Sequence, residues 1–178
     1  HIKVTGTARA EVAPDQMTWR LGVTSRNAAL EAAAAAHATT VQKVLGFLQE
    51  TGIPADGVQS SRMAFGEDWS YSGGNRVMQG YIATSQICFR TPDLERYKAL
   101  WMGLARIPSV SVEAVAYDTT RRIELQNETR RKAPLAAREK AAHLAATLGA
   151  APGAPWAIMA YGNPLDSKGC MDNAKINP

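Results

Sequence analysis

Apolar and polar residues alternate at the start of the chain with the period of a β-strand. Over residues 2–10 the even positions are apolar or small, and the odd positions are lysine, threonine or arginine. This pattern is typical of a strand with one face in water. After a turn at Pro14-Asp15, the apolar residues Met17, Trp19, Leu21 and Val23 repeat the alternation. We therefore expect a β-hairpin or meander over residues 2–23.

Farther along, the apolar period switches between that of a helix and that of a strand. Steps of three and four from Leu30 to Leu48 predict a helix over 27–50 that Gly52 and Pro54 end. Thr91-Pro92-Asp93 supplies an N-cap and an N-terminal proline for another helix. The remaining predicted elements are strands over 58–65, 77–90, 110–117 and 156–160, a glycine-rich turn over 67–75, a helix over 93–107 and a helix from about 118 to Gly149.

The resulting order of elements is ββαββαβαβ. Short turns between neighbouring strands and longer crossings through helices predict an α+β fold, with helices packed on mainly antiparallel sheet. We expect one domain over residues 1–162, with two possible small lobes formed by 1–56 with 121–162 and by 57–120. Residues 163–178 show no period and predict an irregular tail.

In the last long helix, small residues share one face. We expect the stripe of Ala137, Ala141 and Leu144 to lie against a sheet. The basic run at 130–132, with Arg138 and Lys140, would then face water. Pro134 interrupts this helix, and a proline inside a helix costs about 3 kcal/mol or forces a kink, which puts the continuity of the helix in question.

The composition is that of an ordinary globular protein. Apolar residues make up 46% and charged residues 20% of the 178 positions, far from the signature of disorder. The net charge of +4 is spread among interspersed acidic and basic residues, which argues against a nucleic-acid partner.

No apolar run approaches the roughly 20 residues of a membrane-spanning helix. The first residue is His1, as in a mature secreted protein, and Cys88 and Cys170 form no CxxC pair, so whether they pair stays open.

No motif predicts catalysis, a cofactor or a metal. The sequence contains no GxSxG, HExxH, GxxxxGK[ST] or GxGxxG. Glu139 and His143 share a helical face without an evident third ligand, and His37 lies on the apolar stripe of the first helix. The alternative to a non-enzymatic protein is an enzyme, such as a hydrolase, with a dispersed acidic site drawn from Asp15, Glu67 and Asp68.

The turn within residues 67–75 is the strongest candidate for a contact surface. Trp69 and Tyr71 precede the flexible pair Gly73 and Gly74. Aromatic side chains on a surface turn are costly to expose unless they contact a partner or fold back on the core. We therefore expect self-association through this turn, through the edge of the long hairpin, or through both, or else contact of the turn with an unknown protein or small ligand.

Three stretches of the chain resemble the SIMPL-domain family, which includes bacterial periplasmic immunogenic proteins. They are VTGTARAEVAPDQMTWRLGV, QGYIATSQICFR and APLAAREKAAHLAATLGA. The residues that carry the resemblance are Gly6, Pro14, Asp15, Gly80, Tyr81, the segment 137–141 with Arg138, and Gly149. Turn geometry, close backbone approach and a small-residue helix face account for them without a ligand.

The resemblance implies an exported, periplasmic or secreted bacterial protein of two lobes that self-associates. It also implies a broad link to cell-envelope or stress functions, and it supplies no catalytic residue. Two features depart from the family pattern, namely Pro134 and the polar tail after Asn163, where relatives close with a strand. We therefore expect a non-catalytic envelope protein that acts as a homo-oligomer or binding protein.

Overall fold

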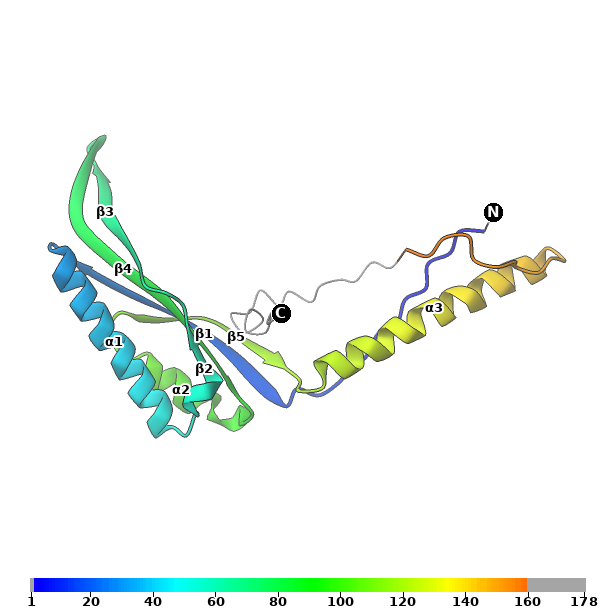
Figure 1. Ribbon diagram of the computed structural model, residues 1–178, viewed down its shortest axis with the longest axis horizontal. Helices are drawn as coiled ribbons and strands as arrows, with labels where there is room; N and C mark the ends of the chain where they lie inside the picture. The colour runs from blue at the N-terminus through cyan, green and yellow to red at the C-terminus, as the bar shows by residue number, and fades with distance from the viewer. Residues whose placement is uncertain (1, 160–178) are drawn as a thin grey trace, which may run out of the picture. The chain divides into compact units, whose positions relative to one another are not determined.

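A five-stranded antiparallel sheet forms the centre of the larger part of the chain (Figure 1). The computed structural model describes residues 2–159. The strands follow the order β2-β4-β1-β5, and β3 also pairs with β4. Their bounds are β1 Gln16–Asn27, β2 Val58–Ser60, β3 Ala64–Ser72, β4 Asn75–Thr91 and β5 Val110–Asp118.

Two helices cover one face of this sheet (Figure 1). These are α1 (Leu30–Glu50) and α2 (Tyr97–Leu104). The odd-numbered residues of β1 from Met17 to Val23 are fully buried beneath them, as the alternation in the sequence predicted. The rest of the core comes from β4, α1 and α2, through Ile87, Phe89, Val44, Leu48, Leu100 and Leu104.

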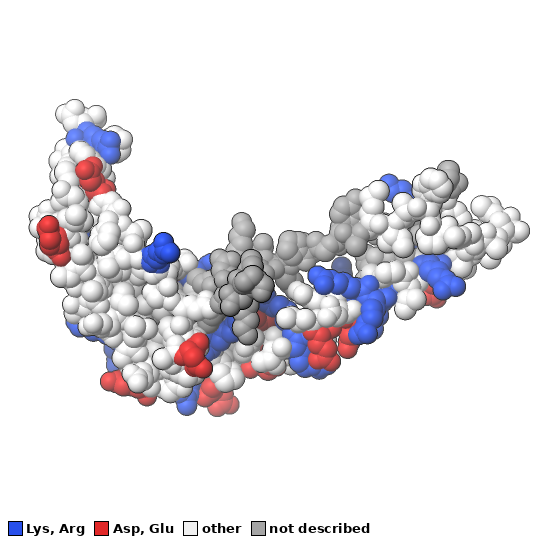
Figure 2. All heavy atoms as spheres, viewed as in Figure 1, with Lys and Arg blue, Asp and Glu red and all other residues white. Residues whose placement is uncertain are grey.

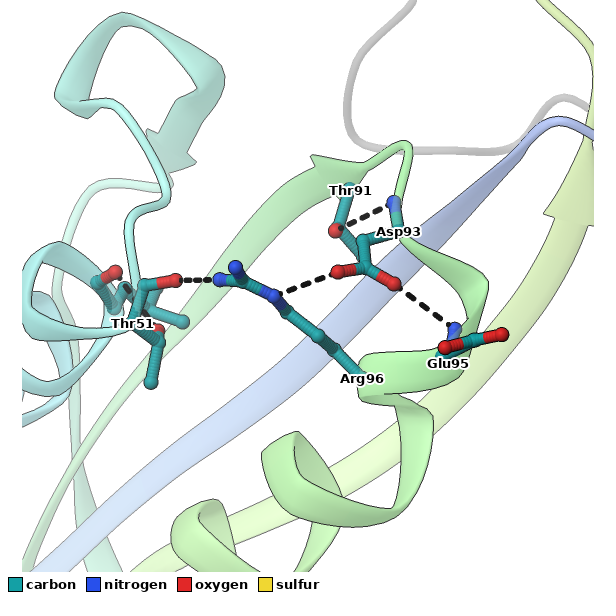
Figure 3. A network of polar contacts seen from close by, with 6 residues as sticks. Thr51, Thr91, Asp93, Glu95 and Arg96 are labelled. Carbon is teal, nitrogen blue, oxygen red and sulfur yellow. Dashed lines mark hydrogen bonds and ion pairs between the residues drawn. The ribbon is translucent and has the colours of Figure 1, made fainter.

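A small polar network joins the start of the α2 region to the end of α1 (Figure 3). The Asp93 carboxylate accepts a hydrogen bond from the backbone N–H of Glu95 (3.1 Å) and pairs with the Arg96 guanidinium (2.8 Å). Arg96 also donates to the backbone carbonyl of Thr51. Asp93 is thus the N-cap of a short 3-10 helix, Leu94–Arg96, that leads into α2. The helix start expected here is present, but the cap is Asp93 rather than Thr91, and Pro92 lies before the helix.

The sheet face away from the helices carries the polar side chains of the even-numbered β1 residues. On this side Gln86 donates to the Glu113 carboxylate (2.9 Å), and Arg20 lies 3.8 Å from the same group. Cys88, only 1% exposed, is opposite Arg20 in the ladder between β4 and β1. Cys88 is disulfide-bonded, and Cys170 lies outside the described residues.

The chain divides into two compact units, and each is described by itself. One unit contains residues 15–118, and therefore the whole sheet with α1 and α2. The other contains, of the described residues, 2–14 and 119–159, and therefore α3 (Arg122–Thr147). These boundaries differ from the lobes expected from the sequence, because residues 15–56 belong with the central hairpin.

In the second unit, two strands predicted at the ends of the chain are not formed. Residues 2–14 join no strand, and neither do residues 156–159 at the other end of the described chain. Residues 2–14 instead lie on α3, where Gly6 makes a close contact. A Cβ atom on Gly6 would come within 2.7 Å of the Ala137 Cβ, and closer still to the Ala133 carbonyl. The alternation of residues 2–10 is therefore present without a ladder of backbone hydrogen bonds.

The helix α3 runs without interruption through Pro134. Pro134 and Arg130 are both exposed, so water can solvate the Arg130 carbonyl that loses its backbone donor. The alanine stripe that we expected against a sheet faces residues 2–14 in its own unit. Leu144, expected in the same packing, is 45% exposed. The helix ends at Thr147. Two residues later Gly149 has a φ of +71°, and the backbone N–H groups of Gly149 and Ala150 donate to carbonyls of the last turn, which is a Schellman motif.

The predicted α+β class is confirmed, since helices pack on an antiparallel sheet in the described part of the chain. The order of elements agrees roughly from residue 16 to residue 147, but the single strand expected over 58–65 is divided between β2 and the start of β3. The differences are the two missing terminal strands and the length of the central hairpin. That hairpin carries the candidate site.

Candidate association surface

The strands β3 and β4 continue as a two-stranded ribbon beyond the end of β1 (Figure 1). The last residue of β1, Asn27, is opposite Tyr81, whereas β4 begins six residues earlier at Asn75. The turn of the ribbon consists of Gly73 and Gly74, with φ of +59° and +84°. These left-handed values are adopted easily by glycine, which lets the chain reverse within two residues. We call residues 69–80 the ribbon.

Gly80 marks the point where the ribbon leaves the sheet. Its φ is +136°, and a Cβ atom there would lie 3.0 Å from the Ala28 Cα and closer to the Asn27 carbonyl. A β-bulge between Asp68 and Trp69 lies opposite this point, and bulges bend the strand that contains them. The Asp68 carboxylate pairs with Arg26 of β1 at 3.0 Å, which ties the base of the ribbon to the sheet.

One face of the ribbon is aromatic. Trp69 is directly opposite Met78, and Tyr71 is directly opposite Arg76, so these four side chains project to the same side. We call them the aromatic face. Tyr71 is 80% exposed and Met78 40% exposed. On the other side of the ribbon, Gln79 donates to the Ser70 hydroxyl at 2.8 Å.

The aromatic face continues the core-facing side of the sheet. Along β3, Phe65, Glu67, Trp69 and Tyr71 lie two residues apart, and Phe65 is opposite the buried core residue Ala83. The helix α1 covers this side of the sheet but begins only at Leu30, just after the end of β1. Figure 1 shows the ribbon extending past that helix. An apolar side of the sheet therefore continues beyond its helical cover.

Local contacts hold Trp69 in place. Its indole N–H donates to the Glu67 carboxylate at 2.8 Å, and the Arg76 guanidinium lies over its ring. Glu67 and Arg76 thus orient the indole from two directions. Figure 2, which shows one side of the molecule, shows a basic and an acidic patch near the tip of the projecting end and uncharged surface around them.

The sequence located this surface but not its extent. The predicted turn, 67–75, is confined in the structure to Gly73 and Gly74, with Trp69 and Tyr71 on β3 itself. Sequence reasoning missed Arg76, Met78 and Phe65 as members of the same side. The two-residue spacing from Phe65 to Tyr71 was the available signal, and a glycine-rich composition obscured it.

A comparison with known families identifies the family of the chain. The family model for SIMPL, a protein of unknown function (DUF541), matches residues 2–175. The chain belongs to the SIMPL family. A comparison with curated proteins finds no match. The SIMPL match continues past residue 162, where we placed the end of the domain, and includes most of the tail.

The three acidic residues considered for an active site of this SIMPL chain do not come together. Asp15 precedes the first residue of β1, whereas Glu67 is opposite Tyr81 at the far end of the same strand. Twelve residues of strand at about 3.3 Å each separate them by roughly 35 to 40 Å. Asp68 is paired with Arg26, and Glu67 accepts the Trp69 indole N–H. These carboxylates do not form one site.

A buried histidine and serine form the pair that comes nearest to a catalytic geometry. The His37 Nε2 on α1 lies 2.9 Å from the Ser85 hydroxyl on β4. His37 is 1% exposed, and its burial lowers its pKa below the ordinary value, against an opposing interaction with the Ala83 backbone. The imidazole is closed off from solvent by this burial. We therefore interpret the contact between His37 and Ser85 as a structural one that joins α1 to β4. Sequence reasoning placed His37 on the apolar stripe but did not find Ser85.

Two further residues carried the resemblance to the SIMPL family, namely Tyr81 and Arg138. Tyr81 lies on β4, where it is opposite Asn27 of β1 on one side and Glu67 of β3 on the other. Arg138 is exposed on α3. Within residues 2–159, no group of three or more His, Cys, Asp or Glu side chains is placed to hold a metal ion. No helix in that range is long and apolar enough to cross a membrane.

Proposed function

We propose that this SIMPL protein is a non-catalytic component of the cell envelope that acts by self-assembly. A second copy of the chain is the partner at the ribbon. The observation that carries the proposal is the aromatic face, an exposed continuation of the apolar core side of the sheet beyond α1. A link to envelope stress remains part of this proposal through the family resemblance.

Both chemistry and geometry at the ribbon favour a protein partner. Aromatic residues, methionine and arginine are enriched at protein interfaces, and all three types occur on the aromatic face. Beyond Asn27, the edge of β4 that faced β1 has no partner strand within the described residues. An unpaired edge beside exposed aromatic residues is a common template for strand pairing between copies. A second copy presents the same edge and the same face, which suits a symmetric contact.

Export is supported by the disulfide at Cys88. Disulfides persist in oxidising compartments such as the periplasm and are rare in the cytosol. The resemblance to periplasmic proteins points to the same compartment. Cell fractionation of the full-length precursor tests this part of the proposal, and recovery in the cytosol would contradict it.

The mass in solution tests the proposed self-assembly. Light scattering of the purified chain should give a multiple of the single-chain mass. Replacement of Trp69 and Tyr71 with Ser should lower that mass, because the aromatic face loses its two largest side chains, while the far-ultraviolet circular dichroism stays unchanged. Val77→Ser is the matched control, since Val77 is exposed on the opposite face of the same ribbon. An unchanged mass in the double variant would remove the ribbon as the interface.

A further inference from the structure

Residues 2–12 have the alternating apolar and polar sequence of a β-strand but no neighbouring strand among the described residues. Val4, Gly6 and Ala8 are half-buried, while Lys3, Thr5 and Thr7 are exposed. This period-two burial indicates that Val4, Gly6 and Ala8 face α3, where Gly6 makes its close contact with Ala137. No described strand pairs with the segment on either side. We call residues 2–12 the N-terminal segment.

The helix behind the N-terminal segment offers more apolar surface than one extended segment can cover. Leu144 follows Ala137 by seven residues, so it shares the helical face that Gly6 contacts, and Leu148 is the C-cap residue of the same helix. Leu144 and Leu148 are nevertheless exposed. Ile2 and Val12, at the two ends of the N-terminal segment, are each about half exposed on the same side. A second strand beside the first would cover part of this surface.

We propose that the N-terminal segment pairs antiparallel with the same segment of a second copy of this chain. This inference adds a second interface to the proposed self-assembly, and it depends only on residues of the unit that contains α3. The partner is the N-terminal segment of the second copy, because that segment is packed on its own α3. The resulting two-stranded sheet would carry both α3 helices on one side. Such a contact is isologous and closed by a two-fold axis.

The charges of the N-terminal segment select one register. With Thr7 opposite Thr7 of the second copy, Lys3 lies opposite Glu11, and Ile2 lies opposite Val12. Opposite charges and paired apolar or threonine residues across a ladder are favourable. The register centred on Gly6 would instead place Lys3 opposite Arg9, and like charges directly opposite are unfavourable. Of these two registers, the sequence favours the one centred on Thr7, which also pairs Lys3 with Glu11.

Cysteine cross-linking tests both the contact and its register. Thr7 is exposed, so Thr7→Cys should fold normally, and across the two-fold axis its Cβ atoms would be within reach of a disulfide. Mild oxidation should give a covalent dimer whose linked peptides both contain position 7. Thr5→Cys is the matched control, because position 5 lies opposite position 9 and should cross-link little with itself. Thr5→Cys combined with Arg9→Cys should restore the cross-link.

A charge exchange tests the same register without cysteine. Lys3→Glu places a carboxylate opposite Glu11 of the other copy at both ends of the paired strands. The dissociation constant of the dimer should therefore rise roughly tenfold. Adding Glu11→Lys should restore the affinity. Failure of Thr7→Cys to form an intermolecular link would overturn the proposal. An intramolecular link between Thr7→Cys and Ile158→Cys would also overturn it, since the chain's own residues would then fill the place. Repeating the cross-linking in the Trp69→Ser/Tyr71→Ser variant separates this interface from the ribbon.

Discussion

The guanidinium carbon of Arg76 lies 4.1 Å from the centre of the Trp69 ring. The two residues are on opposite strands of the ribbon and on the same face. An arginine over an indole is attracted by the electron-rich face of the ring. The contact matters here because the ribbon extends beyond the sheet, where neither α1 nor β1 supports its strands.

We predict that Arg76→Ala loosens the ribbon and leaves the rest of the protein intact. The lost cation–π contact is worth about 0.5 to 1 kcal/mol at an exposed site. Hydrogen exchange of the amides within residues 69–79 should become several-fold faster, whereas the denaturation midpoint should not move. Arg62→Ala, at an exposed position outside the ribbon, provides the comparison. Equal exchange rates in Arg76→Ala and the unmodified protein would show that the contact does not order the ribbon.

The elements with strong periodicity were predictable from the sequence. The alternation at Trp19 and Leu21 gave β1, and the steps from Leu30 to Leu48 gave α1, because burial on one side repeats with the period of the backbone. The residues around Asp93 identified the start of the α2 region through a capping pattern that acts locally. These signals depend on short-range geometry, so a single sequence carries them.

The state of the N-terminal segment was not predictable in the same way. Its alternation predicted a strand, and the burial of Val4 and Ala8 follows that period, yet a strand also needs a neighbour, which no local pattern can supply. The need for a neighbouring strand also explains why only part of the aromatic face could be predicted. Trp69 and Tyr71 were identified by residue type. The contribution of Arg76 depends on the pairing register of β3 with β4, which the bulge at Asp68 shifts.

We predict that Gly80→Ala destabilises the protein by about 1 to 3 kcal/mol. Its φ of +136° is strained for any residue with a side chain, and the added Cβ would meet the Asn27 carbonyl. Gly46→Ala is the matched control, because a Cβ there meets nothing within 4 Å and the position lies inside α1. Since alanine favours a helix by up to about 1 kcal/mol relative to glycine, the control should be stabilised. Chemical denaturation followed by circular dichroism measures both, and equal midpoints would contradict the role given to Gly80.

We predict that the Cys88 thiol cannot be alkylated before reduction, since Cys88 is disulfide-bonded. Iodoacetamide in denaturant should label Cys88 only after treatment with dithiothreitol, and mass spectrometry of the unreduced digest should identify the linked peptide. A link to Cys170 of the same chain and a link to a second copy are distinguished by the mass of the intact unreduced protein. Labelling of Cys88 without reductant would show that the disulfide is absent from the purified protein.

We predict that acid destabilises the fold through His37, in the pH range just below the ordinary histidine pKa. Burial lowers the His37 pKa in the folded state, so the unfolded chain takes up a proton at a higher pH than the folded chain. Above about pH 6.5 both states are neutral at this position, and the full contribution to stability is present. As the pH falls below that value toward the lowered folded pKa, the unfolded state gains protons first and the free energy of unfolding decreases.

His37→Leu tests this origin of the acid sensitivity. The variant loses the contact with the Ser85 hydroxyl, so its stability at pH 7.5 should be lower, by about 1 to 3 kcal/mol. The decrease in its free energy of unfolding between about pH 7 and pH 5 should nevertheless be smaller than in the unmodified protein, because the group whose proton affinity differs between the two states is gone. His143→Ala, at an exposed position on α3, should retain the pH dependence. Urea denaturation at a series of pH values measures these slopes, and parallel curves for His37→Leu and the unmodified protein would assign the acid sensitivity to other groups.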